Sequence, residues 1–330
     1  MERIELSNSA FEGDNNAYLF AEGSETVLVD TGDWLRETRR QMEEALATRD
    51  IGFADIDRIF LTHWHGDHIG LASEIQDASG APVYVHSADA PLVAGDESAW
   101  EEMHDMQEQY FEQWGIPEDG QSILFELMES PPYLENPPDV TAIEDGDTFT
   151  VNGKELKAVH APGHAAGLCM YETTIDGERD VLTGDALLPQ YTPNVGGADI
   201  RVERPLAKYL KTLSGIVDAE YNRAWPGHRQ PIDDPAGRAA HIIHHHEERS
   251  WRVLDALRRL GPCDTWTVSA DLFGELEHIH ILHGPGESYA HLEHLEDDGV
   301  VVRDGREYRL ADGVEDELDS LDEKRWRLSE

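Results

Sequence analysis

The sequence predicts an α+β protein of four layers, an αβ/βα sandwich in which two sheets pack face to face beneath outer helices, followed by a winged-helix domain. Three observations support this prediction. β-rich and amphipathic helical runs alternate through residues 1–232. Metal-binding side chains follow several strand-like runs, where α/β folds place their sites. Residues 233–310 have the pattern of three helices and a hairpin, and residues 311–330 form an acidic tail.

The first sheet is predicted from short runs that precede and follow a helix. Residues 16–21 and 26–30 are β-rich and are separated by Gly and polar residues, which predicts a hairpin. Residues 34–48 carry apolar side chains at helical spacing and are expected to cover the sheet. The turn at residues 30–32 joins a strand to a helix, or it supports the functional site from beneath, as the resemblance drawn from the motifs below implies. The elements expected next are a strand over 56–61, a helix over 67–78 and a strand over 82–86.

Residues 88–139 interrupt this alternation and are expected to be a helical insertion. Large side chains recur there every three to four residues, at Trp100, Met103, Gln107, Tyr110, Phe111 and Trp114. The insertion could be a lid whose aromatic face shapes a substrate pocket. Alternatively, it is a helical pair that packs on its own core or on another subunit.

The second sheet and the C-terminal domain follow. The sheet is expected from strands over 149–151, 155–160, 168–173, 180–183 and 221–225, with a helix over 205–217. A long helix over 233–260 begins at Asp234-Pro235, a favourable cap and first turn. Two short helices over 265–273 and 288–296, then strands 300–302 and 307–310 around Asp304-Gly305, predict the winged helix. The tail is expected to be partly disordered, with Trp326 and Leu328 as its late apolar anchors.

Four metal-capable side chains lie within the six residues His63-Trp64-His65-Gly66-Asp67-His68, directly after an apolar run. Side chains two apart on an extended backbone point the same way, so His63 and His65 can converge on one ion. Asp67 and His68 begin the next helix and face a second ion. Imidazole and carboxylate ligands suit zinc. The alternative is a chance run in a chain with 17 histidines.

Three further segments lie where a strand-like run gives way to a loop. They are Pro162-Gly163-His164, Thr183-Gly184-Asp185 and Pro226-Gly227-His228. Together with the first motif, this pattern resembles the metallo-β-lactamase superfamily. The resemblance implies two divalent metal ions, most often zinc, with iron or manganese as alternatives. It implies one metal bound by His63, His65 and His164, a second bound by Asp67, His68 and His228, and Asp185 as the bridge.

The expected chemistry is hydrolysis. A metal lowers the pKa of water from 15.7 to about 7, so a water bridging two metals can attack as hydroxide, and no Ser or Cys nucleophile is required. The leading hypothesis is a glyoxalase-II-like hydrolase of a small ester or thioester, with Asp67 as proton acceptor. Tyr191, in a Pro-rich loop after Asp185, could hydrogen-bond the substrate or merely pack.

Two other functions compete with the hydrolase. The C-terminal module also resembles that of an endoribonuclease in the superfamily, so a nuclease or phosphodiesterase is one alternative. A DNA-binding regulator with a degenerate hydrolase domain is the other, and the complete ligand set argues against it. The helix over 288–296 carries no Lys or Arg, whereas phosphate binding needs cations, so nucleic acid is a disfavoured partner. We expect this module to pack on the catalytic domain or on a second subunit. A homodimer is therefore one of the alternatives.

Three other groups of residues have competing interpretations. The basic residues Arg201 and Arg204, with Lys208 and Lys211, could receive an anionic substrate or pair with surplus carboxylates. The tract over 244–246 is all histidine, but consecutive helical residues point in three directions, which disfavours metal binding. His160 is expected to pack or to support a ligand.

The composition is extremely acidic, with 68 Asp and Glu against 26 Lys and Arg and a net charge of -42. Such self-repulsion opposes folding at low salt and is screened at molar salt, as in the cytoplasm of an extreme halophile. No apolar run of 18 residues exists, so we expect a cytoplasmic protein without a membrane partner. Cys169 and Cys263 lie far apart, which disfavours a disulfide or a thiolate zinc site and predicts that both pack as small apolar side chains.

Overall fold

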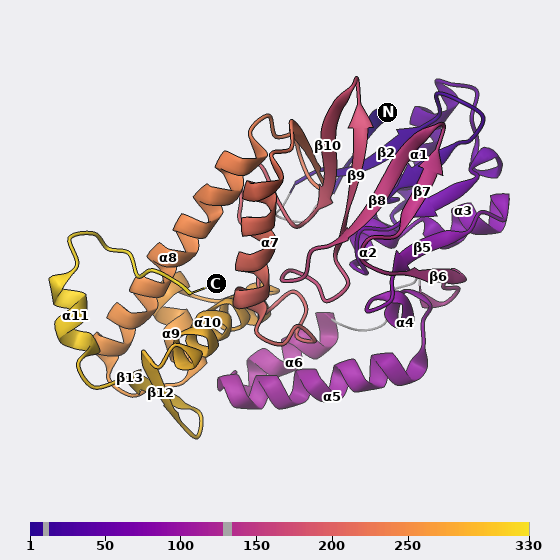
Figure 1. Cartoon of the computed structure of the whole chain (residues 1–330). Coiled ribbons are helices and arrows are strands. Elements are labelled where there is room, and N and C mark those ends of the chain that lie inside the picture. Colours follow the sequence, from indigo (N-terminus) through magenta and orange to yellow (C-terminus); the bar gives the residue numbers. More distant parts are fainter. Residues whose placement is uncertain (9–12, 128–133, 330) are drawn as a thin grey trace.

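The computed structural model describes residues 1–8, 13–127 and 134–329, and it arranges most of them in a layered sandwich (Figure 1). The first sheet has the strand order β1-β2-β3-β4-β5-β6. The hairpin of β2 and β3 is confirmed, and β3 to β6 run parallel. The strands are β1 (Glu2–Leu6), β2 (Asn15–Phe20), β3 (Val27–Val29), β4 (Arg58–Phe60), β5 (Val83–His86) and β6 (Val140–Ile143).

The second sheet has the order β11-β10-β9-β8-β7. Its strands are antiparallel except for β11, which runs parallel to β10. The strands are β7 (Thr148–Val151), β8 (Lys154–His160), β9 (Cys169–Ile175), β10 (Glu178–Gly184) and β11 (Arg223–Pro226). Each matches a predicted strand to within a few residues.

Three apolar cores hold the layers together. Between the sheets, Phe60 and Tyr171 meet edge to face with ring centroids 5.6 Å apart. α1 (Arg36–Ala47) and α3 (Ala72–Ser79) cover the first sheet through Met42 and Ile75. α7 (Pro205–Ala219) covers the second sheet through Leu213 and is joined by the first half of α8 (Pro235–Leu260). The four layers arise because each sheet has apolar side chains on both faces.

The helix predicted over 67–78 is instead two helices, α2 (Gly66–Ile69) and α3. The break follows from a close backbone contact at Gly70, where a Cβ atom would lie 2.3 Å from the carbonyl carbon of Asp33. Gly70 N also donates to the Gly32 carbonyl at 2.8 Å. The chain bends there to bring the metal-binding segment against the turn at residues 30–32.

The insertion is helical as predicted and forms α4 (Ala90–Val93), α5 (Glu97–Trp114) and α6 (Glu118–Leu127); residues 128–133 lie outside the described part. Its apolar face packs on another part of the same chain as well as on its own residues. Phe111 and Trp114 pack with Ile281 and Tyr289 of α10 (His280–Asp297), a helix of the C-terminal module of the same chain. Figure 1 shows α5 and α6 beneath α7 and alongside α10.

The C-terminal module contains the second half of α8, then α9 (Thr265–Phe273), α10 and the hairpin of β12 (Val301–Asp304) and β13 (Glu307–Leu310). α8 contributes to the core of the sandwich and to the core of the module, so residue 232 does not separate them cleanly. Asp304 pairs with Glu307, which puts the turn one residue later than expected. α10 begins eight residues before the predicted 288 and continues through Pro285.

The tail departs from the expected disorder. α11 (Val314–Ser320) forms there, and Val314, Leu318 and Trp326 are buried in the core of the module. The backbone of Trp326 also donates to the carbonyl of Glu247 at 3.0 Å. Both cysteines are buried with free thiols. Among the described helices, none has the length and apolar character that a membrane crossing needs.

Candidate metal centre

The predicted ligands converge at one edge of the sandwich, because they follow the ends of β4, β10 and β11 or lie on nearby loops. His63 lies three residues after the end of β4, and Asp185 comes directly after β10; the hydrogen-bonded neighbours of these strands fix their positions. Three groups of side chains there bring ligand atoms within 4.8 Å of one another. The groups are His63, His65 and His164; His63, His68 and Asp185; and Asp67, His68 and His228.

The first cluster contains three imidazole nitrogens that face one another. Nδ1 of His65 lies 2.9 Å from Nε2 of His63 and 3.1 Å from Nε2 of His164. The opposite nitrogens lie near the hydroxyl of Thr62 at 3.0 Å and the carbonyls of Ala198 at 3.1 Å and Asn194 at 2.9 Å. Thr62 already donates its hydroxyl proton to Asp30, so it accepts from His63.

These outer hydrogen bonds assign one proton to the far nitrogen of each ring. The three facing nitrogens therefore carry lone pairs and have no hydrogen between them. Such an arrangement is repulsive alone and is stabilised by a cation. Zinc-binding histidines typically donate their second N–H to a carbonyl or carboxylate in this way.

The second cluster combines two imidazoles and a carboxylate. Oδ2 of Asp67 lies 3.4 Å from Nε2 of His228 and 3.8 Å from Nε2 of His68. The far nitrogen of His228 lies 3.0 Å from the Gly13 carbonyl, and that of His68 lies 2.9 Å from Asp30. Again the outer partners turn the inner nitrogens toward a common point.

Asp185 connects the two clusters. Its Oδ1 atom lies 3.6 Å from Nε2 of His68, and its Oδ2 atom lies 3.4 Å from Nε2 of His228 and 3.7 Å from Nε2 of His164. The side chain is 2 % exposed. One buried carboxylate thus faces ligands of both predicted metal positions.

Two buried atoms at this centre test whether metal ions fit. Nε2 of His68 and Oδ1 of Asp185 have no hydrogen-bond partner among the described residues. Leaving such a group unpaired costs about 1–3 kcal/mol, and more for a charged group. Nitrogen and carboxylate oxygen atoms are the donors that zinc prefers, so the residues fit a pair of divalent metal ions.

The electrostatics divide the histidines into two kinds. Burial lowers the pKa of His63 and His164, and it lowers that of His65 to about 4, which keeps the first cluster neutral. Burial also opposes protonation of His228, but Asp185 and Asp67 outweigh it and raise its pKa to about 9. His228 therefore holds a proton that a metal ion would displace.

Asp30 supports the centre from below, which decides between the two interpretations of its turn. Its Oδ1 accepts from the Thr62 backbone at 2.8 Å, and its Oδ2 accepts from the Thr62 hydroxyl at 2.8 Å and from His68 at 2.9 Å. Asp30 adopts a φ of +59°, a left-handed conformation that Asp tolerates better than most residues. The Asp30 carboxylate thereby orients the ligand His68 directly and the ligand His63 through Thr62.

Arg201 belongs to a buried ion network rather than to a free anion-binding surface. Its Nη2 atom lies 2.7 Å from Asp89 and 2.5 Å from Asp199, and both carboxylates are fully buried. Asp89 also accepts from the backbones of Trp64 and Gly167. The structure therefore favours pairing with carboxylates over the substrate-binding hypothesis for Arg201.

The network joins the two loops that carry the first cluster. Asp199 accepts from the Trp64 indole at 3.1 Å and from the Ala166 backbone at 2.8 Å. Trp64 lies between His63 and His65, and Ala166 follows His164 by two residues. Asp89 and Asp199 carried no recognisable signal in the sequence, because their function depends on contacts between distant loops.

The other sequence hypotheses have separate outcomes. Arg204 pairs with Asp297 at 2.7 Å on the surface, while Lys208 and Lys211 are exposed. His160 stacks on His86 with ring centroids 4.0 Å apart and belongs to none of the ligand groups found among the described residues. The ring of Tyr191 is 43 % exposed and lies beneath the guanidinium of Arg229, so its substrate role stays a prediction.

Of the tract over 244–246, only His246 is buried, where it groups with Glu287 and His291. Nη1 of Arg249 donates to Glu287 at 2.6 Å and commits that carboxylate to an ion pair. A cation beside the carboxylate opposes a metal ion there. The geometry agrees with the expectation that the tract as a whole is not a ligand set.

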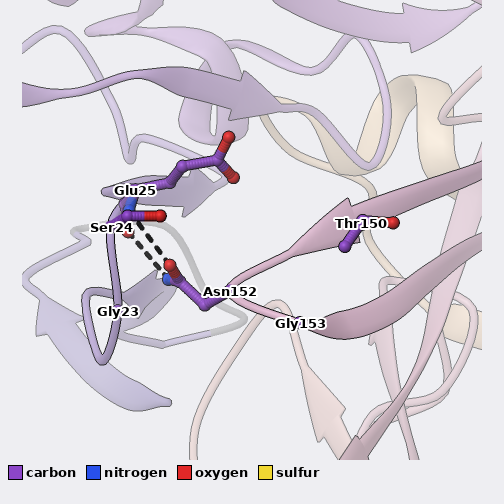
Figure 2. A pocket seen from close by; sticks show the side chains of 6 residues that line it. All are labelled: Gly23, Ser24, Glu25, Thr150, Asn152 and Gly153. Carbon is purple, nitrogen blue, oxygen red and sulfur yellow. Dashed lines mark hydrogen bonds between the residues drawn. The ribbon is translucent and has the colours of Figure 1, made fainter.

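A hollow of about 450 Å³ lies where the turn before β3 meets the turn between β7 and β8 (Figure 2). Asn152 closes the contact by accepting from Glu25 N at 3.0 Å and donating to Glu25 O at 2.8 Å. β3 and β4 run parallel, and the hollow precedes β3 whereas the metal ligands follow β4. The hollow therefore lies at the amino-terminal ends of these parallel strands, and the candidate centre lies at their carboxyl-terminal ends.

The profile of the Metallo-beta-lactamase superfamily matches residues 10–270. The chain belongs to this superfamily. Its fold is similar to that of the metallo-beta-lactamase family protein TTHA1429 from Thermus thermophilus, with 29% identity and a TM-score of 0.78 over 94% of this chain and 98% of that one. A beta-lactamase domain protein from Burkholderia ambifaria, at 21% identity and a TM-score of 0.72, shares the fold over 94% of this chain and 91% of that one.

Curated relatives match at lower coverage. Lactamase-like protein aptB of Emericella nidulans is 28% identical over 74% of this chain and 62% of its own length. Beta-lactamase-like protein 2 homolog of Drosophila melanogaster is 26% identical over 72% of this chain and 66% of its own. The Atrochrysone carboxyl ACP thioesterase AgnL7 of Paecilomyces divaricatus is 27% identical over 82% of this chain and 66% of its own. The chain thus spans about two thirds or less of these relatives.

Proposed function

We propose that this superfamily member is a dinuclear metal-dependent hydrolase of an ester or thioester, similar to glyoxalase II. The position of Asp185 carries the proposal, because its two oxygens face ligands from both clusters. Two divalent metal ions, most often zinc with iron or manganese as alternatives, would supply Lewis acidity that polarises a carbonyl and lowers the pKa of water to about 7. His63, His65 and His164 would hold one ion, Asp67, His68 and His228 the other, and Asp185 both.

Asp67 is the residue best placed to receive a proton during hydrolysis. Its side chain is 25 % exposed, whereas that of Asp185 is 2 % exposed. Oδ2 of Asp67 accepts from the amides of Asn8 and Asn15, each at 3.1 Å, which fixes the carboxylate in place. Tyr191 remains a proposed donor to the substrate from the loop after Asp185.

The ion pairs of the basic residues favour a carbonyl substrate over nucleic acid. Arg201 and Arg204 are both paired with aspartates, which leaves Lys208 and Lys211 as the exposed basic residues of this segment, too few for a stripe of phosphate contacts. α10 contacts the insertion and the metal-bearing domain, which supports a packing function for the proposed winged-helix module. The thioesterase named among the relatives agrees with an acyl substrate.

The solution state is also a proposal. The net charge of -42 supports a salt-rich cytoplasm as the working environment, with no membrane partner. A homodimer is compatible with this account, and small-molecule esters or thioesters are the proposed partners.

The decisive experiment is turnover by the metal-loaded protein at molar salt against a thioester and ester panel beside a labelled single-stranded RNA. We expect acyl hydrolysis that a chelator abolishes and that the metal restores. Metal-dependent RNA cleavage that is lost in Asp67→Ala, with every ester and thioester untouched, would replace this proposal by the nuclease alternative. The Asp67→Ala control separates the centre from a contaminating nuclease.

A further inference from the structure

Residues 194–199, in the loop before α7, supply the outer hydrogen-bond partners of two ligands in the first cluster. The carbonyl of Asn194 lies 2.9 Å from Nδ1 of His164, and that of Ala198 lies 3.1 Å from Nε2 of His65. A carbonyl can only accept, so each contact assigns a proton to the outer nitrogen and leaves a lone pair on the inner one. The position of this segment therefore sets the direction of two imidazole ligands.

The side chain of Asn194 shapes the segment and also ties it to α10. Its Oδ1 atom accepts from the backbone N–H of Gly197 at 3.0 Å and of Ala198 at 2.8 Å. Its Nδ2 atom donates to the carbonyl of His283 at 3.0 Å and to Oε2 of Glu287 at 3.2 Å. Two donors face the amide oxygen and two acceptors face the amide nitrogen, which fixes the orientation of the group.

The carboxylate of Glu287 is in turn held by α8. Nη1 of Arg249 donates to Oε1 of Glu287 at 2.6 Å, and the two side chains are 13 % and 5 % exposed. Oε2 of the same carboxylate accepts from Asn194 and from the backbone N–H of Val195 at 3.4 Å. One buried carboxylate thus connects α8 and α10 to the segment behind the first cluster.

The backbones of α10 and the segment are also in direct contact. A Cβ atom on Gly286 would lie 2.2 Å from Cα of Gly197, and one on Gly196 would lie 2.5 Å from the carbonyl oxygen of Gly286. Gly196 has a φ of +91°, a conformation that favours glycine. The segment therefore has no room to move toward α10, and its hydrogen bonds to Glu287 oppose movement away.

The second cluster takes its outer partners from the other end of the chain. Nδ1 of His68 lies 2.9 Å from Asp30, and Nδ1 of His228 lies 3.0 Å from the carbonyl of Gly13. Both partners precede α1 in the sequence. A displacement of the segment should therefore disturb the first cluster directly and the second only through the shared Asp185.

We propose that the C-terminal module positions the first metal site, with Asn194 and Glu287 transmitting the placement of α10 to the imidazoles of His65 and His164. Both are positioning residues, because each acts through the ligands rather than on the metal. The inference rests on the metal centre of the proposed function. It goes beyond that function by giving the module a part in metal binding.

The first test is Asn194→Asp, which keeps the acceptor for the backbones of Gly197 and Ala198. It replaces the donor to α10 by a carboxylate oxygen that faces Glu287. The affinity for one of the two ions should fall by about 10–100-fold, and the affinity for the other should change far less. Calorimetric titration of the metal-free full chain with zinc at molar salt measures both, and circular dichroism checks the fold.

Cobalt identifies the ion that is lost, because its visible spectrum depends on its ligands and their geometry. His65→Ala removes a ligand of the first cluster, and His228→Ala removes a ligand of the second, so their spectra provide references. At limiting cobalt, Asn194→Asp should give the spectrum that remains in His65→Ala. The spectrum that remains in His228→Ala would overturn the proposal.

A reciprocal exchange separates positioning from a general loss of stability. Glu287→Gln supplies an amide donor, so the double variant Asn194→Asp, Glu287→Gln again pairs a donor with an acceptor at this contact. It should recover most of the zinc affinity that Asn194→Asp loses. Losses that simply add in the double variant would contradict a shared contact.

The second test alters no charge. Gly286→Ala places a methyl group against Gly197 and should weaken the first ion as Asn194→Asp does. Gly284→Ala is the matched control on the same helix, because its methyl group would meet the side chains of Ser269 and Leu276 instead of the segment. Equal weakening of the first ion in both variants would overturn the proposal.

These titrations need no substrate, so they separate this inference from the proposed function. If no ester or thioester is hydrolysed but Asn194→Asp selectively weakens the first ion, the hydrolase proposal fails and the inference stands. If the wild type binds a single ion, the dinuclear centre fails, and the inference stands only if that ion is lost in His65→Ala and weakened in Asn194→Asp. Unchanged affinities in Asn194→Asp, equal weakening of both ions, or a wild type that binds no ion would overturn the inference.

Discussion

Asp30 accepts a hydrogen bond of 2.9 Å from Nδ1 of His68 and thereby turns Nε2 of the same ring toward Asp185, 3.6 Å away. The carboxylate lies beneath the centre and is 2 % exposed. It also holds Thr62, whose hydroxyl accepts from His63. A side chain outside the predicted ligand set thus orients one ligand of each cluster.

Asp30→Asn should lower the affinity for metal ions by about 10–100-fold, because an amide does not reproduce two carboxylate acceptors beneath the ligands. Metal titration followed by calorimetry measures the change. Asp33→Asn is the matched control, since Asp33 is also buried but accepts from Leu35 and Thr38 instead of a ligand. Equal affinities in Asp30→Asn and the wild type would remove the positioning function.

Asp185→Asn and His65→Ala should each abolish hydrolysis and leave the fold largely intact. Both residues lie on loops above the sheets, so the apolar cores do not depend on them. Turnover and circular dichroism, measured on the same preparations, test this expectation. Retention of more than about a tenth of wild-type turnover in either variant, a loss of less than about 1.4 kcal/mol in transition-state stabilisation, contradicts the ligand assignment.

Arg201→Met should destabilise the folded state by about 3–5 kcal/mol, because it leaves Asp89 and Asp199 buried without their cation. Arg204→Met is the control and should change stability by about 0–1 kcal/mol, because its pair with Asp297 is exposed. Denaturant unfolding at molar salt measures both. A similar cost for the two variants would mean that the buried network contributes no more than a surface pair.

The loss in Arg201→Met should also depend on pH. Burial raises the pKa of Asp89 to about 6 even beside Arg201, so the folded state binds a proton more readily than the unfolded chain. Stability from this group is therefore lost as pH rises through the folded-state pKa, and removal of the cation strengthens the effect. The variant should lose more stability at pH 7.5 than at pH 5, and an equal loss at both would show that the carboxylates do not titrate there.

The melting temperature should rise steeply with salt. The net charge of -42 repels itself over about 10 Å at 0.1 M salt and over about 3 Å at 1 M. Many exposed arginines pair locally with acids, such as Arg39 with Glu43 and Glu74, but these pairs use few of the 68 acidic residues. A melting temperature that stays flat from low to molar salt would contradict the halophile interpretation.

The sequence predicted the sandwich and the convergence of the candidate ligands, because both follow from patterns along the chain. The spacing of His63 and His65 on extended chain determines their direction, and alternating runs determine the strands. The split between α2 and α3 was not predicted, because it depends on the contact of Gly70 with the distant backbone of Asp33. α10 was predicted too short, since Gly284, Pro285 and Gly286 resemble a break but allow close contact with the loop at residues 196–197.

The supporting residues of the centre were harder to predict. Asp89 and Asp199 become neighbours only when the loop after β5 meets the loop before α7, and Arg201 resembled a free cation until both were in place. Such sites depend on the tertiary fold rather than on a motif.

The number of metal ions per chain tests the central claim most directly. Elemental analysis of protein purified without chelator, at molar salt, should give about two divalent ions per chain, because Asp185 faces ligands from two complete clusters. The count should fall in His65→Ala while the protein stays folded. A reproducible value near one in the wild type would contradict the dinuclear centre.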